Sequence, residues 1–377
     1  MGARLDEHAG FGRGFSFLRH FLAVAVIAMH TSFVLYGLSP FTATGAWLVL
    51  FAILPMFFAL GGFLVSASAD RLPLGEFVTN RGLRIFPAMG VEILLAACIL
   101  GPAVTSFSWR DYFGDPNFAQ YFLSVIGWVQ FDLPGVFLAA PLPNVVNGSL
   151  WTVPQDLAAY LLLACLIFFG LFRRPRAILG ATLLLLLSDA ALQIDAGASM
   201  IASSRTIELG TLFVGTKLIA SFFCGCALYK YRYHIPFHPG IALSLGAGLL
   251  LVGTLGDPVW AFHPLFRTVT LPVLAYLTIL LGHMRLPPLP LPTRADYSYG
   301  IYLYGFPIQQ TVTYVLPGLR DPLPHFLLSM VIIVLFAAFS WHCVERPLAS
   351  YRKRFSYVAE GRRLPSSEKE PAFAAEA

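Results

Sequence analysis

One apolar stretch of the chain, RHFLAVAVIAMH at residues 19–30, has an arginine at one end and a histidine at the other. Arg19 and His30 would lie about 20° apart around a helix and roughly 16 Å apart along it. In a membrane, Arg19 would lie at the headgroup level and His30 about half-way across the hydrocarbon. Because ionisable groups at that depth are unfavourable and point to function, His30 is a candidate general base or nucleophile. The alternative is a buried histidine that only hydrogen-bonds to a neighbouring helix.

A second basic pair stands in the stretch FVTNRGLRIFP. Arg81 and Arg84 are three positions apart, so they share a helix face. Either one alone is explained as an anchor at the cytoplasmic surface. Together with Arg19, however, they would form a guanidinium cluster at the cytoplasmic mouth of the bundle, which suits bidentate phosphate binding. A ligand with phosphates at one end and a reactive group deep in the bilayer would fit this pattern, and acyl-coenzyme A has that shape.

The composition is that of a membrane protein. Of the 377 residues, 57% are hydrophobic and 12% are charged, against about 25% charged in an ordinary soluble domain. Apolar runs predict an all-α, polytopic membrane bundle of about ten transmembrane helices, near residues 17–37, 45–68, 85–105, 155–172, 177–193, 207–228, 239–256, 262–283, 297–316 and 324–344. We find no internal repeat, which disfavours a transporter built from paired halves.

Basic residues gather in every second loop, which orients the helices because lysine and arginine accumulate on the cytoplasmic side. Both termini are therefore predicted to be cytoplasmic, with residue 40 facing outward and residues 75, 174 and 355 facing the cytoplasm. Residues 1–355 are expected to form the transmembrane domain, with residues 106–154 as an outer interfacial cap. Residues 356–377 have the low hydrophobicity of a disordered cytoplasmic tail.

Two classes of site are not expected. The net charge of +5 is scattered and forms no basic stripe, so we expect no nucleic-acid binding. The histidines are dispersed without a ligand pattern, so we expect no metal site. The five cysteines lie in apolar runs, where Cys224 and Cys226 indicate helix packing rather than a disulfide.

Six blocks, in order over about residues 14–350, resemble the signature stretches of the membrane-bound acyltransferase 3 family: RHFLAVAVIAMH, FFALGGFLV, RGLRIFP, SLWTVPQDLAAYLL, DYSYGIYLYGFPIQQ and SWHCVERPL. That family includes bacterial O-antigen, exopolysaccharide and nodulation-factor acetylases. The resemblance implies transfer of an acyl group, usually acetyl from acetyl-CoA, to a carbohydrate hydroxyl. It places the family's Arg-x10-His motif on Arg19 and His30, and its Arg-x-x-Arg motif on Arg81 and Arg84.

The chain departs from the family's pattern at two places. Many members have Ser-Gly-Phe where this chain has Gly61, Gly62 and Phe63, so no hydroxyl is assigned there. Many members have glutamate after the Leu-Trp-Ser/Thr block, where this chain has Asp156. The aspartate is one methylene shorter.

The block NGSLWTVPQD lies where the cap meets the fourth span. Trp151 and Ser149 are candidate acceptor-binding residues, with Trp151 stacking on a sugar, although an interfacial tryptophan is equally explained as an anchor. Asp156 is a candidate catalytic residue that would bind an acceptor hydroxyl or orient His30.

Other ionisable and tyrosine side chains in the predicted spans have structural explanations as well. A structural ion pair of Asp156 with Lys217 or Arg267 competes with a catalytic role for that aspartate. Glu92 has the same ambiguity, and packing is the favoured role of three tyrosines, Tyr299, Tyr302 and Tyr304.

The sequence therefore predicts an O-acyltransferase integral to the bacterial inner membrane, which moves acetyl from cytoplasmic acetyl-CoA to a hydroxyl of a cell-surface or exported glycan. The expected partners are acyl-CoA, a glycan or lipid-linked saccharide, and membrane lipids. The chain would act alone or hand its acyl group to a separate periplasmic protein. The rival interpretation is a transporter or flippase for a lipid-linked sugar, with His30 as a proton relay.

Overall fold

The computed structural model describes residues 1–2, 5, 13–37, 47–200, 206–256, 263–284 and 295–348. It describes their side chains except for residues 13, 194–200 and 206–214. The predicted tail and two positions of the topology prediction, residues 40 and 355, lie outside the described residues.

The described chain is all-helical, and each predicted apolar run falls on a helix. The long helices are α2 (Arg13–Tyr36), α3 (Trp47–Arg71), α4 (Leu74–Leu95), α8 (Val153–Phe168), α9 (Pro175–Met200), α10 (Thr206–Lys230), α11 (Pro239–Leu255), α12 (Pro264–Gly282), α13 (Ser298–Val315) and α14 (Pro322–Phe339). Within the described ranges, seven helices are long and apolar enough to cross a membrane. The helical class is confirmed, whereas the count of ten spans and the placement of the termini stay predictions.

The third predicted span starts eleven residues earlier than expected. Pro73 immediately precedes α4, which begins at Leu74 and continues through a π-helical turn, η2 (Ala96–Leu100), into α5 (Gly101–Val104). Arg81 and Arg84 therefore lie seven and ten residues inside α4, or about 10 and 15 Å from its start. Both arginines lie on the helix itself, because residues 75–82 extend α4 rather than form a loop.

The centre of the bundle depends on close contact between α3 and α10, which pack extensively along each other. A Cβ atom on Gly62 would overlap the carbonyl oxygen of Phe222, and one on Gly225 would overlap that of Ala59. The Cys226 thiol donates to the Gly62 carbonyl at 3.5 Å. Small residues on both helices thus let the backbones approach, as they do in membrane bundles generally, and the packing role predicted for Cys226 is confirmed.

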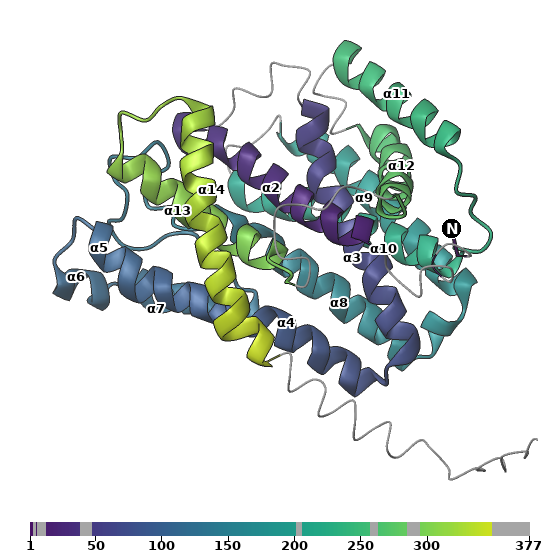
Figure 1. Cartoon of the computed structure of the whole chain (residues 1–377), viewed down its shortest axis with the longest axis horizontal. Helices are drawn as coiled ribbons and strands as arrows, with labels where there is room; N and C mark the ends of the chain where they lie inside the picture. The colour runs from purple at the N-terminus through teal and green to yellow at the C-terminus, as the bar shows by residue number, and fades with distance from the viewer. Residues whose placement is uncertain are drawn as a thin grey trace, which may run out of the picture.

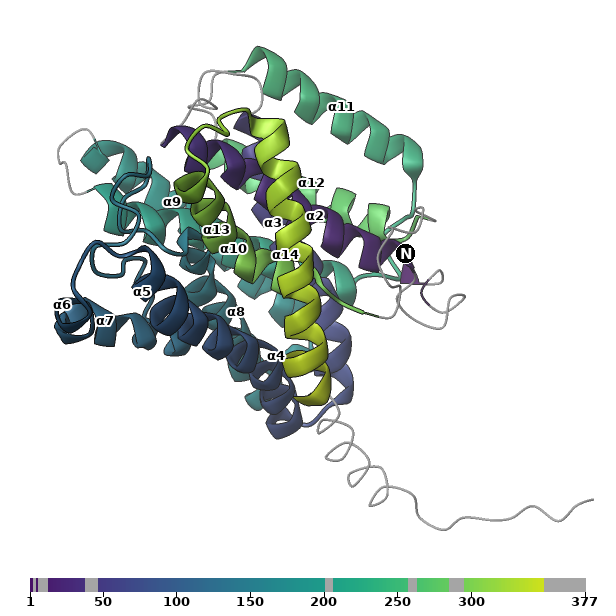
Figure 2. The ribbon, with the colours of Figure 1, turned by 60° about the vertical axis from the view of Figure 1, so that its left-hand side comes forward.

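A compact cap follows α5 and lies at one end of α4, on the opposite edge of the molecule from α11 (Figures 1 and 2). It contains α6 (Trp109–Gly114), α7 (Pro116–Tyr121) and two 3₁₀ turns, η3 (Phe122–Ile126) and η4 (Gly148–Thr152). The buried Tyr112 hydroxyl donates to the Ala97 carbonyl at 2.8 Å and fastens the cap to α4–α5. The last turn of the cap, η4, runs directly into α8 and so brings the NGSLWTVPQD block into the bundle.

Candidate active site

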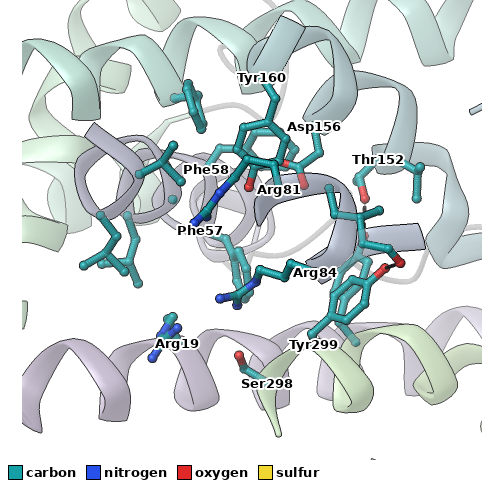
Figure 3. Close-up of a pocket in the computed structure, with 18 of the residues that line it drawn as sticks. Arg19, Phe57, Phe58, Arg81, Arg84, Thr152, Asp156, Tyr160, Ser298 and Tyr299 are labelled. Atoms are coloured by element: carbon teal, nitrogen blue, oxygen red, sulfur yellow. Dashed lines mark hydrogen bonds between the residues drawn. The ribbon is translucent and has the colours of Figure 1, made fainter. Parts of the chain in front are cut away.

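Side chains from α2, α3, α4, α8 and α13 line one cavity of about 380 Å³ inside the bundle. The cavity brings together Arg19 from α2 and Arg81 and Arg84 from α4. Figure 3 shows the three side chains directed toward a common space. The structure therefore brings together the three arginines that were expected to cluster. Their position relative to the membrane stays a prediction.

Asp296, which precedes α13, is the counter-ion of two of these arginines. Its Oδ2 atom accepts hydrogen bonds from Arg19 Nη1 at 2.6 Å and from Arg84 Nη2 at 3.1 Å. Its Oδ1 atom accepts one from the Ser298 hydroxyl at 2.6 Å. Burial alone would raise the pKa of the Asp296 carboxyl, but Arg19 and Arg84 together hold that pKa well below its usual range. The carboxylate thus stays ionised and fixes the orientation of two guanidinium groups.

His20 positions the segment that carries Asp296. Its Nε2 atom accepts the backbone N–H of Tyr297 at 3.2 Å, so the proton lies on Nδ1, which donates to the Ser16 carbonyl at 2.8 Å. The histidine is buried, as is the ring of Tyr297. His20 is therefore a structural residue one position from Arg19, and it is unsuitable as a neutral control in mutagenesis.

Another part of the cavity lining is formed by the first turns of α8. Asp156 and Tyr160 both line the cavity, and Asp156 interacts electrostatically with Arg81 and Arg84. Figure 3 shows Asp156, Tyr160 and Arg81 grouped on one side of the cavity. Asp156 therefore faces the arginine cluster, a position that the sequence did not predict.

The rest of the lining is mostly apolar. It also includes two hydroxyl groups that are hydrogen-bonded to each other. Phe57 and Phe58 of α3 face the space. The hydroxyls of Thr152 and Tyr302 are 2.6 Å apart, and Tyr302 also donates to the Ser149 carbonyl at 3.0 Å. Tyr302 thus joins α13 to η4 and lines the cavity at the same time, which is more than the packing role expected for it.

Arg267 does not form the ion pair with Asp156 that would compete with a catalytic role for this aspartate. Arg267 Nη2 binds Asp189 Oδ1 at 2.6 Å, and both side chains are almost fully buried between α9 and α12. The Lys217 ammonium lies 4.6 Å from the centre of the Phe51 ring. Asp189 lies inside α9 and neutralises Arg267. Asp156 is consequently not the counter-ion of Arg267; it interacts with Arg81, Arg84 and Tyr160 instead.

His30 lies further along α2 and is buried, with 5% of its surface exposed. Its ring stands edge-on to Phe306 of α13, with 5.3 Å between ring centres, and its Nδ1 atom has no hydrogen-bond partner. His30 is not among the residues that line the cavity. Within the described part of the chain no hydrogen bond joins it to Asp156, so the structure gives no support to an orienting role for that aspartate.

The two candidate acceptor-binding residues of η4 differ. Ser149 is fully buried and its hydroxyl has no partner, while its backbone N–H donates to Asn147 Oδ1 at 3.0 Å. Trp151 packs against the core cluster around Phe222. Glu92 accepts from Asn147 Nδ2 at 2.9 Å, which fastens η4 to α4 and gives Glu92 a structural role.

The sequence of residues 13–342 matches a family model described as an acyltransferase domain, the acyltransferase 3 family. The chain belongs to the acyltransferase 3 family. An O-acetyl transferase of Shigella phage Sf6 is 25% identical over 301 residues, which cover 77% of this chain and 82% of that protein. Nodulation protein 10 of Rhizobium leguminosarum bv. viciae is 27% identical over 371 residues, which cover 93% of this chain and 97% of that protein. No solved structure matches the chain.

The family match resolves the choice between an enzyme and a transporter. This acyltransferase carries Arg19, Arg81, Arg84, Asp156 and Asp296 within the matched range. Together with the seven apolar helices, the match identifies a membrane acyltransferase. In the described part of the acyltransferase, no cluster of His, Cys, Asp and Glu side chains is arranged to hold a metal ion.

The sequence did not predict a place in this site for Asp296, Tyr160 or Tyr302. The signal for Asp296 was present, since a lone carboxylate directly before an apolar helix needs a partner. Tyr160 lies one turn after Asp156 and shares its helix face. Nothing in the sequence separates Tyr302 from its neighbours in SYGIYLYGFP.

Proposed function

We propose that the protein is a bacterial inner-membrane O-acyltransferase that moves an acyl group, acetyl in our proposal, from cytoplasmic acyl-CoA to a hydroxyl of a cell-surface or exported glycan. The observation that carries this proposal is the convergence of three arginines and Asp156 on one largely apolar cavity of a membrane acyltransferase. Apolar walls accept a thin pantetheine arm, and guanidinium groups suit the phosphates at its end.

Arg19, Arg81 and Arg84 would bind the phosphates of the donor. Two of them are already oriented by Asp296, so little side-chain entropy is lost when a phosphate binds. The acyl pantetheine arm would follow Phe57 and Phe58 toward the hydroxyl pair of Thr152 and Tyr302. Asp156 interacts electrostatically with Arg81 and Arg84, so it would orient the phosphate-binding arginines. The acceptor-binding role expected for it would require the acceptor hydroxyl to lie beside the donor phosphates.

In the transfer step, the acceptor oxygen attacks the thioester carbonyl carbon. A carbon–oxygen bond forms and the carbon–sulfur bond breaks. For the hydroxyl proton to pass to His30 and then to the sulfur of coenzyme A, the acyl arm must reach past the cavity lining to the His30 ring, which stands beside Phe306. In the second form of the mechanism, His30 itself carries the acyl group before the acceptor arrives. The unpartnered Nδ1 atom of this buried imidazole supports either role.

The acceptor is proposed from the names of the relatives, an O-acetyl transferase and a nodulation protein. Of the two candidate acceptor-binding residues, Ser149 is favoured because its buried hydroxyl has no partner. Trp151 already packs against the core, so stacking on a sugar would require that contact to open.

The test is coenzyme A binding and acetyl-CoA turnover by the purified protein in detergent. Arg81→Gln is the sharpest variant because Asp296 pairs with Arg19 and Arg84 but not with Arg81. We expect the donor to bind about ten- to a hundredfold more weakly, because one charge-assisted hydrogen bond is lost. The KM for the donor should change more than kcat. Arg81→Lys should restore only part of the donor affinity, because an ammonium group lacks the planar pair of N–H donors with which arginine binds a phosphate.

Arg110→Gln, on the exposed surface of the cap, is the matched control. If Arg81→Gln bound coenzyme A as tightly as this control, the arginines would be helix anchors and the donor site would lie elsewhere.

A further inference from the structure

A second cavity of about 560 Å³ lies beside the first, between the α3–α4 turn and the end of α8. It also includes residues of the 3₁₀ turn η5 (Leu171–Arg173), in the loops predicted to be cytoplasmic. Arg71, the last residue of α3, lines both cavities. We call this second space the loop cavity.

The loop cavity carries an excess of positive charge. Asp70 forms an ion pair with Lys230, whose ammonium also lies 3.8 Å from the centre of the Phe172 ring. That carboxylate is therefore already neutralised. Neither Arg71 nor Arg173 pairs with a carboxylate anywhere in the described ranges, so two guanidinium groups face the space without a counter-ion.

One of these arginines is held in place. Arg71 Nε donates to the Ala67 carbonyl of its own helix at 3.0 Å, which fixes the guanidinium group at the end of α3. Phe168 also lines the loop cavity and leaves 70% of its surface exposed. An exposed aromatic face beside two arginines is a suitable platform for a purine ring with an attached phosphate.

We propose that the loop cavity binds the 3′-phosphoadenosine end of the donor coenzyme A. This inference rests on the proposed function and divides the donor between two cavities that meet at Arg71. Arg19, Arg81 and Arg84 then take the diphosphate, Arg71 and Arg173 take the 3′-phosphate, and Phe168 stacks on the adenine. The division is needed because a cavity of about 380 Å³ is at the small end for a drug-sized ligand, and coenzyme A is larger.

The experiment compares acetyl-CoA with 3′-dephospho-acetyl-CoA as donors for the full-length protein in lipid-free detergent. For the wild type, we expect the KM for acetyl-CoA to be lower than that for 3′-dephospho-acetyl-CoA by about tenfold or more. This ratio corresponds to one charge-assisted contact to the 3′-phosphate. Arg173→Gln should raise the KM for acetyl-CoA, leave that for the dephospho donor unchanged, and so abolish the preference. Arg81→Gln should weaken both donors equally.

Arg174→Gln is the matched control, because Arg174 is exposed in the same loop but does not line the loop cavity. It should keep the wild-type preference. Arg71→Gln and Phe168→Ala are further variants, with gel filtration to show that each is folded.

Equal KM values for the two donors in the wild type, or an unchanged preference in Arg173→Gln, would overturn the subsite while the proposed function stands. The same holds if Arg173→Gln binds coenzyme A normally but no longer retains anionic phospholipid in native mass spectrometry, since the arginines would then hold a lipid headgroup. A wild type that binds neither donor would overturn the proposed function and the subsite together.

Discussion

His30 combines three properties that are rarely found together unless a histidine has a function. It is buried in a membrane helix, it shares a face with Arg19, and its Nδ1 atom has no partner. We predict that His30→Ala lowers the rate of acyl transfer about 10²- to 10⁴-fold, the usual contribution of a positioned proton-transfer group. Coenzyme A binding by calorimetry should stay almost normal.

His234→Ala is the control for this prediction, because His234 is exposed and does not line the cavity that contains the three arginines. His20→Ala should instead weaken donor binding, because His20 holds the Tyr297 backbone beside Asp296. Near-normal turnover of His30→Ala at matched expression would remove this histidine from the mechanism.

Asp296 gives the site a defined pH dependence. Since Arg19 and Arg84 lower its pKa in the folded protein, its ionised form stabilises the fold at every pH above the unfolded pKa of about 3.9, and this contribution is lost only as the pH falls through the lower folded value. We expect Asp296→Asn to lower stability by about 3 kcal/mol, because it leaves two arginines without their counter-ion.

The destabilisation should be equal at about pH 7 and pH 5 and shrink only below about pH 4. Melting temperatures of the wild type and Asp296→Asn in detergent measure it. Convergence of the two curves already at about pH 5 would show that the pKa of Asp296 is not lowered.

Among the helices, the contact between α3 and α10 is the least tolerant of added volume. Gly62→Ala should destabilise the protein by about 1–3 kcal/mol, because the new methyl group meets backbone rather than a movable side chain. Gly90→Ala in α4 is the control, since nothing lies within 4 Å of its Cβ position and helix propensity favours alanine by up to about 1 kcal/mol. Thermal unfolding in detergent distinguishes them, and equal melting temperatures would contradict the close approach.

The close approach also clarifies one departure from the family pattern. At Gly61, a Cβ atom would meet only the Phe222 ring at 3.9 Å. The packing thus requires glycine at position 62, whereas position 61, where the resemblance implies serine, has room for a small side chain.

Hydrophobic runs predicted the helices well, because their lengths reflect the thickness of the bilayer. They could not predict that α4 begins at Leu74, since an amphiphilic first turn resembles a loop in a hydropathy window. Arg19, Arg81 and Arg84 were predicted as a cluster from spacing and type. Asp296 was missed because it lies 277 positions from Arg19 along the chain. The pairing of Asp189 with Arg267 likewise depends on helix neighbours that no single-sequence pattern specifies.

At the scale of the whole molecule, the alternation of basic loops makes a prediction about both membrane faces. Single cysteines are introduced into a cysteine-free background. An impermeant maleimide added from outside should label a cysteine at position 40 and one at position 117 of the cap. Residues 75, 174 and 355 should react only after the membrane is opened. Labelling of 75 or 174 from outside would reverse the orientation, and with it the face from which the donor enters.

The shared carboxylate of Asp296 also bears on how fast the product leaves. Three arginines without a counter-ion would hold a polyphosphate tightly, and their charges would be left unpaired whenever the cavity emptied. Asp296 already binds Arg19 and Arg84. The binding free energy of an arriving phosphate is therefore only the amount by which these arginines bind phosphate more strongly than they bind the carboxylate. On departure of the proposed coenzyme A product, the same carboxylate would keep both guanidinium groups paired. If coenzyme A binds at these arginines as proposed, the ion pair would lower the barrier to product release, a step that limits the turnover of many enzymes.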